Sequence, residues 1–106
     1  MRGDIVVLPF PFSDLTQTKR RPSLVMASLD GDDVILCQLT SQAKDKRAIL
    51  IESADFQSGA LKRSSYARPS RIFTADSNII LYRIGTLTPK KLNEIIDAAV
   101  AILQGN

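Results

Sequence analysis

The sequence predicts a mainly β fold, a small and strongly bent barrel followed by one C-terminal helix. Short apolar runs of strand length recur between turn residues up to Gly85, and a single helical pattern follows Thr88. The 106 residues are the length of one domain, and residues 1–106 contain no repeat, low-complexity tract or linker. We therefore expect a single domain of five or six strands and one helix.

Three strands are expected in the first part of the chain. Asp4–Leu8 is a nearly continuous apolar run of strand length. Ser23–Leu29 and Asp33–Thr40 flank the sequence Asp30-Gly31-Asp32. An Asp-Gly pair between two β-rich runs favours a hairpin because glycine accepts a positive φ. The last two strands should therefore pair antiparallel.

Further strands are expected in the second part of the chain, at Ala48–Glu52, Ser64–Thr74 and Ile79–Ile84. Residues 53–60 are rich in turn formers and predict one helical turn that ends at Gly59. Pro69 cannot donate to a β-ladder, so its strand should lie at an edge or contain a bulge. Gly85 is expected to end the last strand.

One amphipathic helix is expected at the C-terminus. Thr88 is a good N-cap, and Pro89 suits the first helical position. Gly105 should end the helix. One apolar stripe recurs at helical spacing: Leu92, Ile95, Ile96, Ala99, Ile102 and Leu103.

The composition excludes several kinds of chemistry. The sequence has no histidine and one cysteine, so disulfides, the common zinc sites and the Ser-His-Asp and Cys-His arrangements are excluded. Cys37 lies within an apolar run and is expected to be a small buried thiol and not a nucleophile. An enzyme with this composition must work with Arg, Lys, Asp, Glu, Ser, Thr or Tyr.

The charge distribution indicates a polyanionic partner. The formal net charge is +3, and residues 19–71 carry ten Lys or Arg against six Asp or Glu. A basic region of this kind suits nucleic acid. No apolar run approaches the roughly 20 residues that a membrane helix needs, and the first apolar run is too short for a signal-peptide core. We therefore expect a cytoplasmic protein that does not enter a membrane.

Arg21 and Thr40 form the most sharply defined candidate site. Arg21 lies nine residues before Asp30, and Thr40 lies eight residues after Asp32, so the hairpin should bring the two together within the slip that one bulge absorbs. A guanidinium supplies a fixed fork of donors, and a hydroxyl adds a neutral donor, which together suit a phosphate. The alternative is a Thr-Ser capping turn beside a surface arginine.

Four short motifs then connect the chain to a known family. In order they are Gly3-Asp4-Ile5-Val6 with Pro9-Phe10, Arg21-Pro22-Ser23-Leu24-Val25, Leu39-Thr40-Ser41-Gln42, and Ile84-Gly85-Thr86-Leu87. With this order and spacing, the chain resembles the MazF/PemK toxins of bacterial toxin-antitoxin systems over nearly its whole length. The resemblance implies a small SH3-like barrel of the CcdB/MazF type with five to seven strands. It also implies a homodimeric toxin, a ribosome-independent endoribonuclease that cuts single-stranded mRNA at short sequences and inhibits growth.

The resemblance also implies a catalytic core and a partner. In such toxins the arginine of the Arg-Pro pair and the threonine of the Thr-Ser motif match Arg21 and Thr40. Attack by the RNA 2′-hydroxyl on the adjacent phosphate then needs no metal and no cofactor. Some members carry an acidic residue on the strand that corresponds to Ser64–Thr74, which has none here, so the general base is left unassigned. A cognate antitoxin would lay a disordered acidic and apolar tail along the dimer groove.

Further residues are expected to bind the RNA: Ser41, Gln42, Lys19, Arg20, Lys44, Tyr66, Arg68 and Arg71. The basic ones would follow the phosphates, and Tyr66 would either stack on a base or pack in the core. Phe10 and Phe12 form either a hydrophobic plug over the barrel end or a lid on the RNA groove. Asp14 is either a carboxylate near Arg21 or a solvated turn former.

Two other functions fit a barrel of this kind. A CcdB-like poison of DNA gyrase shares the fold, but such toxins end in a tail that contains Trp. This chain has no Trp and ends in Leu103-Gln104-Gly105-Asn106. The other alternative is a non-catalytic RNA-binding barrel, in which Arg21→Ala weakens RNA binding and there is no cleavage to lose.

Overall fold

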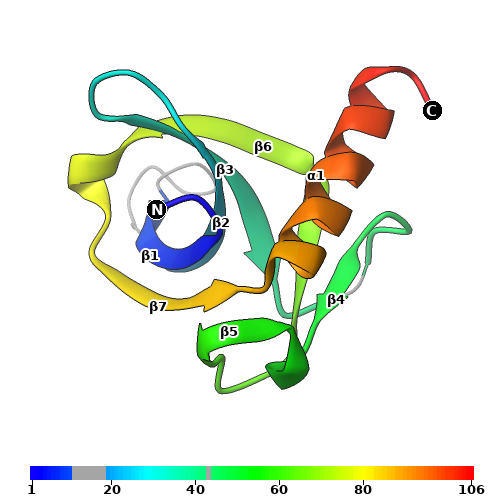
Figure 1. Cartoon of the computed structure of the whole chain (residues 1–106), viewed down its shortest axis with the longest axis horizontal. Helices are drawn as coiled ribbons and strands as arrows, with labels where there is room; N and C mark the ends of the chain where they lie inside the picture. The colour runs from blue at the N-terminus through cyan, green and yellow to red at the C-terminus, as the bar shows by residue number, and fades with distance from the viewer. Residues whose placement is uncertain (11–18, 43) are drawn as a thin grey trace.

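The computed structural model describes residues 1–10, 19–42 and 44–106, which form one curled antiparallel sheet with a C-terminal helix (Figure 1). Within these residues, seven strands lie in the order β4-β6-β3-β2-β1-β7-β5. The strands are β1 (Asp4–Phe10), β2 (Lys19–Ser28), β3 (Asp33–Thr40), β4 (Ile49–Ile51), β5 (Phe56–Gly59), β6 (Ser65–Asp76) and β7 (Tyr82–Leu87). The helix is α1 (Pro89–Leu103). The predicted mainly β barrel with one terminal helix is confirmed.

The strands bury side chains on both faces, which explains their nearly continuous apolar sequences. On β1, Ile5 belongs to a cluster that also contains the buried face of α1, whereas Val6 belongs to a second cluster on the opposite face. Leu24 and Val25 on β2 divide between the two clusters in the same way. Successive strand residues point to opposite faces, so a strand that is covered on both sides needs apolar residues at consecutive positions.

The hairpin between β2 and β3 has the predicted antiparallel pairing and the predicted bulge. Val25 pairs with Leu36, but Ala27 pairs with Ile35, so β2 contains one extra residue between these pairs. This single slip is the one that the spacing of the hairpin required. The strand β2 begins at Lys19, earlier than the predicted start, because its first residues pair with the end of β1. That pairing is a tertiary contact that local sequence does not show.

A large bulge interrupts β6 at Pro69. Cys37 pairs with Ile72 and Leu39 pairs with Ala67, so the single residue Gln38 of β3 is opposed by the four residues 68–71 of β6. The bulge predicted for Pro69 is confirmed. The alternative of an edge strand is wrong, since β6 lies between β4 and β3. The bulge bends the sheet beside Gln38.

The strands β5 and β7 differ from the prediction. A 3₁₀ turn at Ser53–Asp55 matches the expected helical turn, but residues 56–59 form the unpredicted strand β5. The expected end of the turn at Gly59 is therefore wrong. Gly59 pairs with Gly85 of β7, and a Cβ atom added at Gly59 would collide with the carbonyl oxygen of Ile84. The two backbones approach so closely that only glycine fits.

The boundaries of β7 also differ from the prediction. Residues 77–79 form a 3₁₀ turn, in which the Asp76 side chain accepts a hydrogen bond from the Asn78 backbone N–H at 2.8 Å. The strand therefore starts at Tyr82 and not at Ile79. It also continues to Leu87, so Gly85 lies inside the strand and does not end it. The reason is the close approach to β5, which requires a glycine within this strand.

The helix α1 begins as predicted, with the Thr88 side chain accepting a hydrogen bond from the Lys91 backbone N–H at 3.3 Å. Leu92, Ile95 and Ala99 are buried against the barrel. The predicted apolar stripe is wrong at its end, because Leu103 is 73% exposed, and Figure 1 shows the last turns of α1 extending past the sheet. No helix in the described ranges is long and apolar enough to span a membrane.

Candidate functional site

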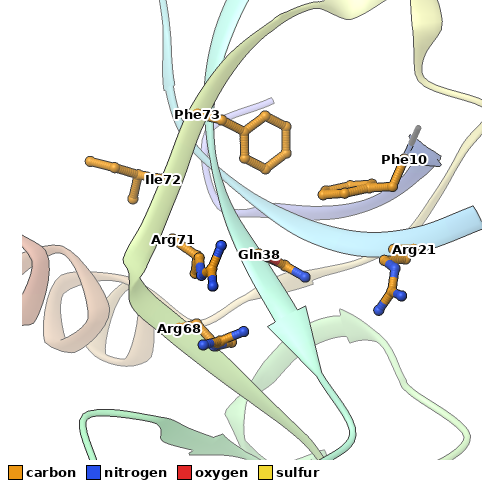
Figure 2. Close-up of a pocket in the computed structure, with 7 residues that line it drawn as sticks. All are labelled: Phe10, Arg21, Gln38, Arg68, Arg71, Ile72 and Phe73. Atoms are coloured by element: carbon orange, nitrogen blue, oxygen red, sulfur yellow. The ribbon is translucent and has the colours of Figure 1, made fainter. Parts of the chain in front are cut away.

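Two cavities meet at Arg21, where β2, β3 and β6 lie together. The larger cavity, of about 530 Å³, is lined by Phe10, Arg21, Gln38, Arg68, Arg71, Ile72 and Phe73 (Figure 2). The smaller cavity, of about 320 Å³, is lined by Lys19, Arg20, Arg21, Pro22, Leu39, Thr40, Ser41 and Ser65. Arg21 borders both, so a ligand that fills one cavity lies next to the other.

Arg21 and Thr40 line the smaller cavity together, as the hairpin register explains. Ser23 pairs with Gln38, and two more steps along each strand bring Arg21 opposite Thr40. Directly opposed residues of antiparallel strands share one face of the sheet. The Thr40 Oγ1 accepts a hydrogen bond from the Gln42 backbone N–H at 3.2 Å, which leaves the hydroxyl proton available to donate to a ligand.

The bulge in β6 places Arg68 and Arg71 on the larger cavity together. Figure 2 shows both side chains on one side of Gln38 and Arg21 on the other. No carboxylate is among the described residues that line either cavity, and neither Arg21 nor Arg71 makes an ion pair with a described residue. Guanidinium groups of this kind, without a neighbouring counter-charge, favour an anionic ligand.

Only some of the other residues predicted to bind RNA line a cavity. Lys19, Arg20 and Ser41 line the smaller cavity. Gln42 and Lys44 are exposed and are not among the described residues that line either cavity. Tyr66 is half-buried on β6 and lies between Thr40 and Leu50 in the sheet. The structure therefore brings seven of the ten predicted site residues to the cavity walls.

Asp45 is an acidic residue near the site that the sequence analysis did not identify. Its Oδ2 lies 3.8 Å from Arg68 Nε and accepts a hydrogen bond from Ser70 Oγ at 3.1 Å. Its Oδ1 accepts a hydrogen bond from the Arg47 backbone N–H at 2.9 Å. That backbone hydrogen bond, followed by the Ser70 hydroxyl and the charge of Arg68, lowers the pKa of Asp45. Asp45 is therefore an anion that ties the segment after Thr40 to the bulge. No periodic signal marks such a loop contact.

Cys37 is buried, as predicted. Burial raises the pKa of the Cys37 thiol to about 12, against the smaller opposing effect of its hydrogen bond to the Arg68 backbone. In that bond Sγ donates to the Arg68 carbonyl oxygen at 3.2 Å. A protonated thiol is a poor nucleophile, so Cys37 supports the bulge and takes no part in covalent chemistry.

Sequence reasoning passed over two polar residues here: Gln38, which belongs to the site, and Ser23, which is buried beside it and lines neither cavity. Gln38 is half-buried and lines the larger cavity. Ser23 lies directly opposite it on β2, and its fully buried hydroxyl has no hydrogen-bond partner among the described residues. The only available signal was a polar residue within an otherwise apolar strand.

Phe10 lies at the apolar end of the larger cavity. It packs in a T-shape against Phe73, with ring centroids 5.1 Å apart and an interplanar angle of 81°, and it is buried. This packing favours the plug interpretation for Phe10. Phe12 and Asp14, the other candidates in this segment, lie outside the described residues. In the described part of the chain, no group of three or more acidic or cysteine side chains is placed to hold a metal ion.

Comparison with protein families gives a match over nearly the whole chain. The model of the family described as "PemK-like, MazF-like toxin of type II toxin-antitoxin system" matches residues 1–103. This is the family that the four sequence motifs predicted. No curated protein matches the sequence.

Solved structures with the same fold are numerous. MazF from Deinococcus radiodurans has a TM-score of 0.76 and 20% identity, covering 96% of this chain and 94% of its own. An endoribonuclease from a mycobacterial species has a TM-score of 0.74 and 19% identity, covering 98% and 90%. A mycobacterial endoribonuclease in complex with its cognate antitoxin has a TM-score of 0.70 and 17% identity, covering 99% and 92%. These similarities confirm the MazF-type fold.

Proposed function

Because this chain belongs to the PemK-like, MazF-like toxins of type II toxin-antitoxin systems, we propose that it is a ribosome-independent endoribonuclease that cuts single-stranded mRNA at short sequences and inhibits growth. The observation that carries this proposal is the cavity that Arg21 and Thr40 line together. Two of the similar solved structures are named endoribonucleases. A permanent cation beside a hydroxyl donor is suited to a phosphodiester.

In the proposed reaction, the RNA 2′-oxygen attacks the adjacent phosphorus while the bond to the 5′-oxygen breaks. The products are a 2′,3′-cyclic phosphate and a 5′-hydroxyl, and the reaction needs no metal and no cofactor. Arg21 stabilises the negative charge that develops on the phosphoryl oxygens. Thr40 holds the phosphate in line for the attack through its free hydroxyl proton. A guanidinium stays protonated in proteins and has no acceptor, so the 2′-hydroxyl proton leaves to a base other than Arg21.

The remaining basic and polar residues bind the RNA on either side of the reacting phosphate. Lys19, Arg20 and Ser41 do so in the smaller cavity, and Arg68 and Arg71 in the larger one. The exposed side chains of Gln42 and Lys44 extend this surface along the segment after Thr40, and Tyr66 adds an aromatic ring beside it. Phosphate contacts of this kind supply affinity without sequence preference.

The protein acts as a homodimer in the cytoplasm and is neutralised by a cognate antitoxin. One of the similar solved structures holds an endoribonuclease with its cognate antitoxin. The basic cavities suit the acidic and apolar tail of such a partner, because their positive charge attracts a flexible segment that carries negative charge.

The test is cleavage of a long single-stranded RNA by the purified protein in EDTA, with the new 5′ ends mapped. We expect the wild type to cut, and Arg21→Ala and Thr40→Ala each to lose about 10²- to 10³-fold in rate. Thr40→Ser, which keeps the hydroxyl, should retain much of the activity. Matched controls are Arg63→Ala and Thr74→Ala, which change exposed residues away from the cavity walls.

Three results would contradict the proposal. Absence of wild-type cleavage on RNAs of varied sequence would favour the non-catalytic RNA-binding barrel if RNA still binds. Inhibition of DNA gyrase in a supercoiling assay, without RNA cleavage, would favour the gyrase poison. Full activity of Arg21→Ala would contradict the assignment of the site.

A further inference from the structure

One group in the larger cavity is not explained by phosphate binding. Arg21, Arg68 and Arg71 are donors only, which is what phosphate oxygens require. The carboxamide of Gln38 carries a donor and an acceptor, and a phosphodiester has no proton for the acceptor to receive. Nucleobases differ from phosphates in this respect, because their edges present donors and acceptors side by side.

The fold exposes this carboxamide to a ligand. Gln38 stands opposite the bulge in β6, so its side chain lies where the sheet opens into the cavity, between Arg21 on one side and Arg68 and Arg71 on the other (Figure 2). The carboxamide makes no hydrogen bond to any described residue. It is therefore available to a ligand in the cavity.

Ser23 adds a second polar group without a partner. It lies directly opposite Gln38, so the two side chains share one face of the sheet. Its hydroxyl is fully buried and unpaired among the described residues, and such groups are rare because they are costly. Ser23 does not line the cavity, so the unpaired group that a ligand can reach is the Gln38 carboxamide. That carboxamide indicates a ligand with both donors and acceptors.

We propose that the larger cavity is a nucleobase pocket and that Gln38 determines which base is accepted, an inference that rests on the proposed nuclease function. The volume of about 530 Å³ lies within the range of small-molecule sites, about 300–1,000 Å³. Ile72 and Phe73 supply apolar surface for the base, while the arginines hold the neighbouring phosphates. Because Arg21 borders both cavities, the base belongs to a nucleotide that adjoins the scissile phosphate.

The test is the sequence preference of cleavage on a pool of randomised single-stranded RNA. In Gln38→Leu, which removes both hydrogen-bonding groups, we expect the preference at one position beside the cut to fall by about 5- to 100-fold. In Gln38→Glu, which replaces the donor with an acceptor, the preferred base at that position should change. All other positions should keep the wild-type preference. The matched control is Gln57→Leu, an exposed glutamine on β5 away from the cavity.

An unchanged preference in folded Gln38→Leu would overturn the inference, as would an equal loss of rate on every sequence. Circular dichroism shows whether each variant is folded, and Gln38→Glu carries the test if Gln38→Leu does not fold. If the wild type does not cleave RNA, the proposed function fails separately, and binding of the four homo-oligoribonucleotides then tests the pocket. A base preference that Gln38→Leu abolishes would support the pocket, and equal wild-type affinity for all four would overturn it.

Discussion

Single side chains at the boundary of β3 and β6 fix the shape of the candidate site. The Cys37 thiol donates to the Arg68 carbonyl, and the Asp45 carboxylate pairs with the Arg68 guanidinium. The backbone and the charged end of Arg68 thus have separate anchors. An arginine with fewer rotamers to lose binds a phosphate at a lower entropic cost.

The buried thiol predicts a pH dependence of stability. An unfolded cysteine ionises near its ordinary pKa of 9.0, whereas burial raises the pKa of Cys37 to about 12 in the folded protein. The buried, protonated thiol therefore makes its full contribution to stability below pH 9. This contribution is lost as the pH rises from about 9 to 12, and the free energy of unfolding falls by up to about 1.4 kcal/mol per pH unit. Urea unfolding of the wild type and of Cys37→Ala between pH 8 and 11 measures this fall in the free energy of unfolding.

Cys37→Ala should show the smaller decline in the free energy of unfolding over this interval, because the lysines and tyrosines are common to both proteins. Equal declines in the two proteins would contradict the effect of burial on the thiol.

At the scale of elements, the contact between β5 and β7 depends on a pair of glycines. Gly59 has a φ of +74° and meets the backbone of Ile84 and Gly85. A short, mostly exposed strand contributes few apolar contacts of its own, so this close backbone pairing holds β5 in the sheet. The contact also explains why β7 continues through Gly85.

Gly59→Ala should destabilise the protein more than Gly31→Ala. Gly31 has a similar φ of +76°, but a Cβ atom added there has no other atom within 4 Å. Its substitution therefore costs only the strain of holding alanine in the left-handed conformation, about 1–2 kcal/mol. At Gly59 the backbone must also move, which adds about 1–3 kcal/mol. The free energies of unfolding in urea give the comparison. Equal losses in the two variants would contradict the close approach.

At the scale of the whole molecule, the basic charge gathers where the two cavities meet. Five of the ten Lys and Arg residues between positions 19 and 71 line these cavities: Lys19, Arg20, Arg21, Arg68 and Arg71. Three of these residues lie in one short segment of β2, and the bulge brings the other two from β6. The surface therefore attracts a polyanion as a unit.

Binding of a non-cleavable RNA should weaken with salt in proportion to the number of phosphates held. For single strands the slope of log affinity against log salt changes by about 0.7 for each contact. Arg71→Ala should therefore lower the slope by about that amount. Arg63→Ala, an equal change of charge at an exposed residue away from the cavities, should leave it nearly unchanged. Identical slopes for these two variants would contradict a phosphate contact at Arg71.

Much of the fold and part of the site could be predicted from local sequence. The Asp-Gly turn predicted the β2–β3 hairpin, and the residue count on its two sides predicted the bulge that aligns Arg21 with Thr40. The contact of Asp45 with Arg68 could not be predicted, because it joins a loop to a strand more than twenty residues away. Gln38 could not be singled out either, since its exposure depends on the bulge of the neighbouring strand.

The sequence by itself determined the local features: where chain reversals occur, which helix face is apolar at its start, and that no histidine chemistry is available. These follow from backbone preference, side-chain period and composition, which each act over a few residues. Only the tertiary structure decided that Gly59 faces Gly85 and that Arg21, Gln38, Arg68 and Arg71 surround one cavity. These arrangements depend on strand register and on a bulge, so they are set by pairing between segments that are distant in the chain.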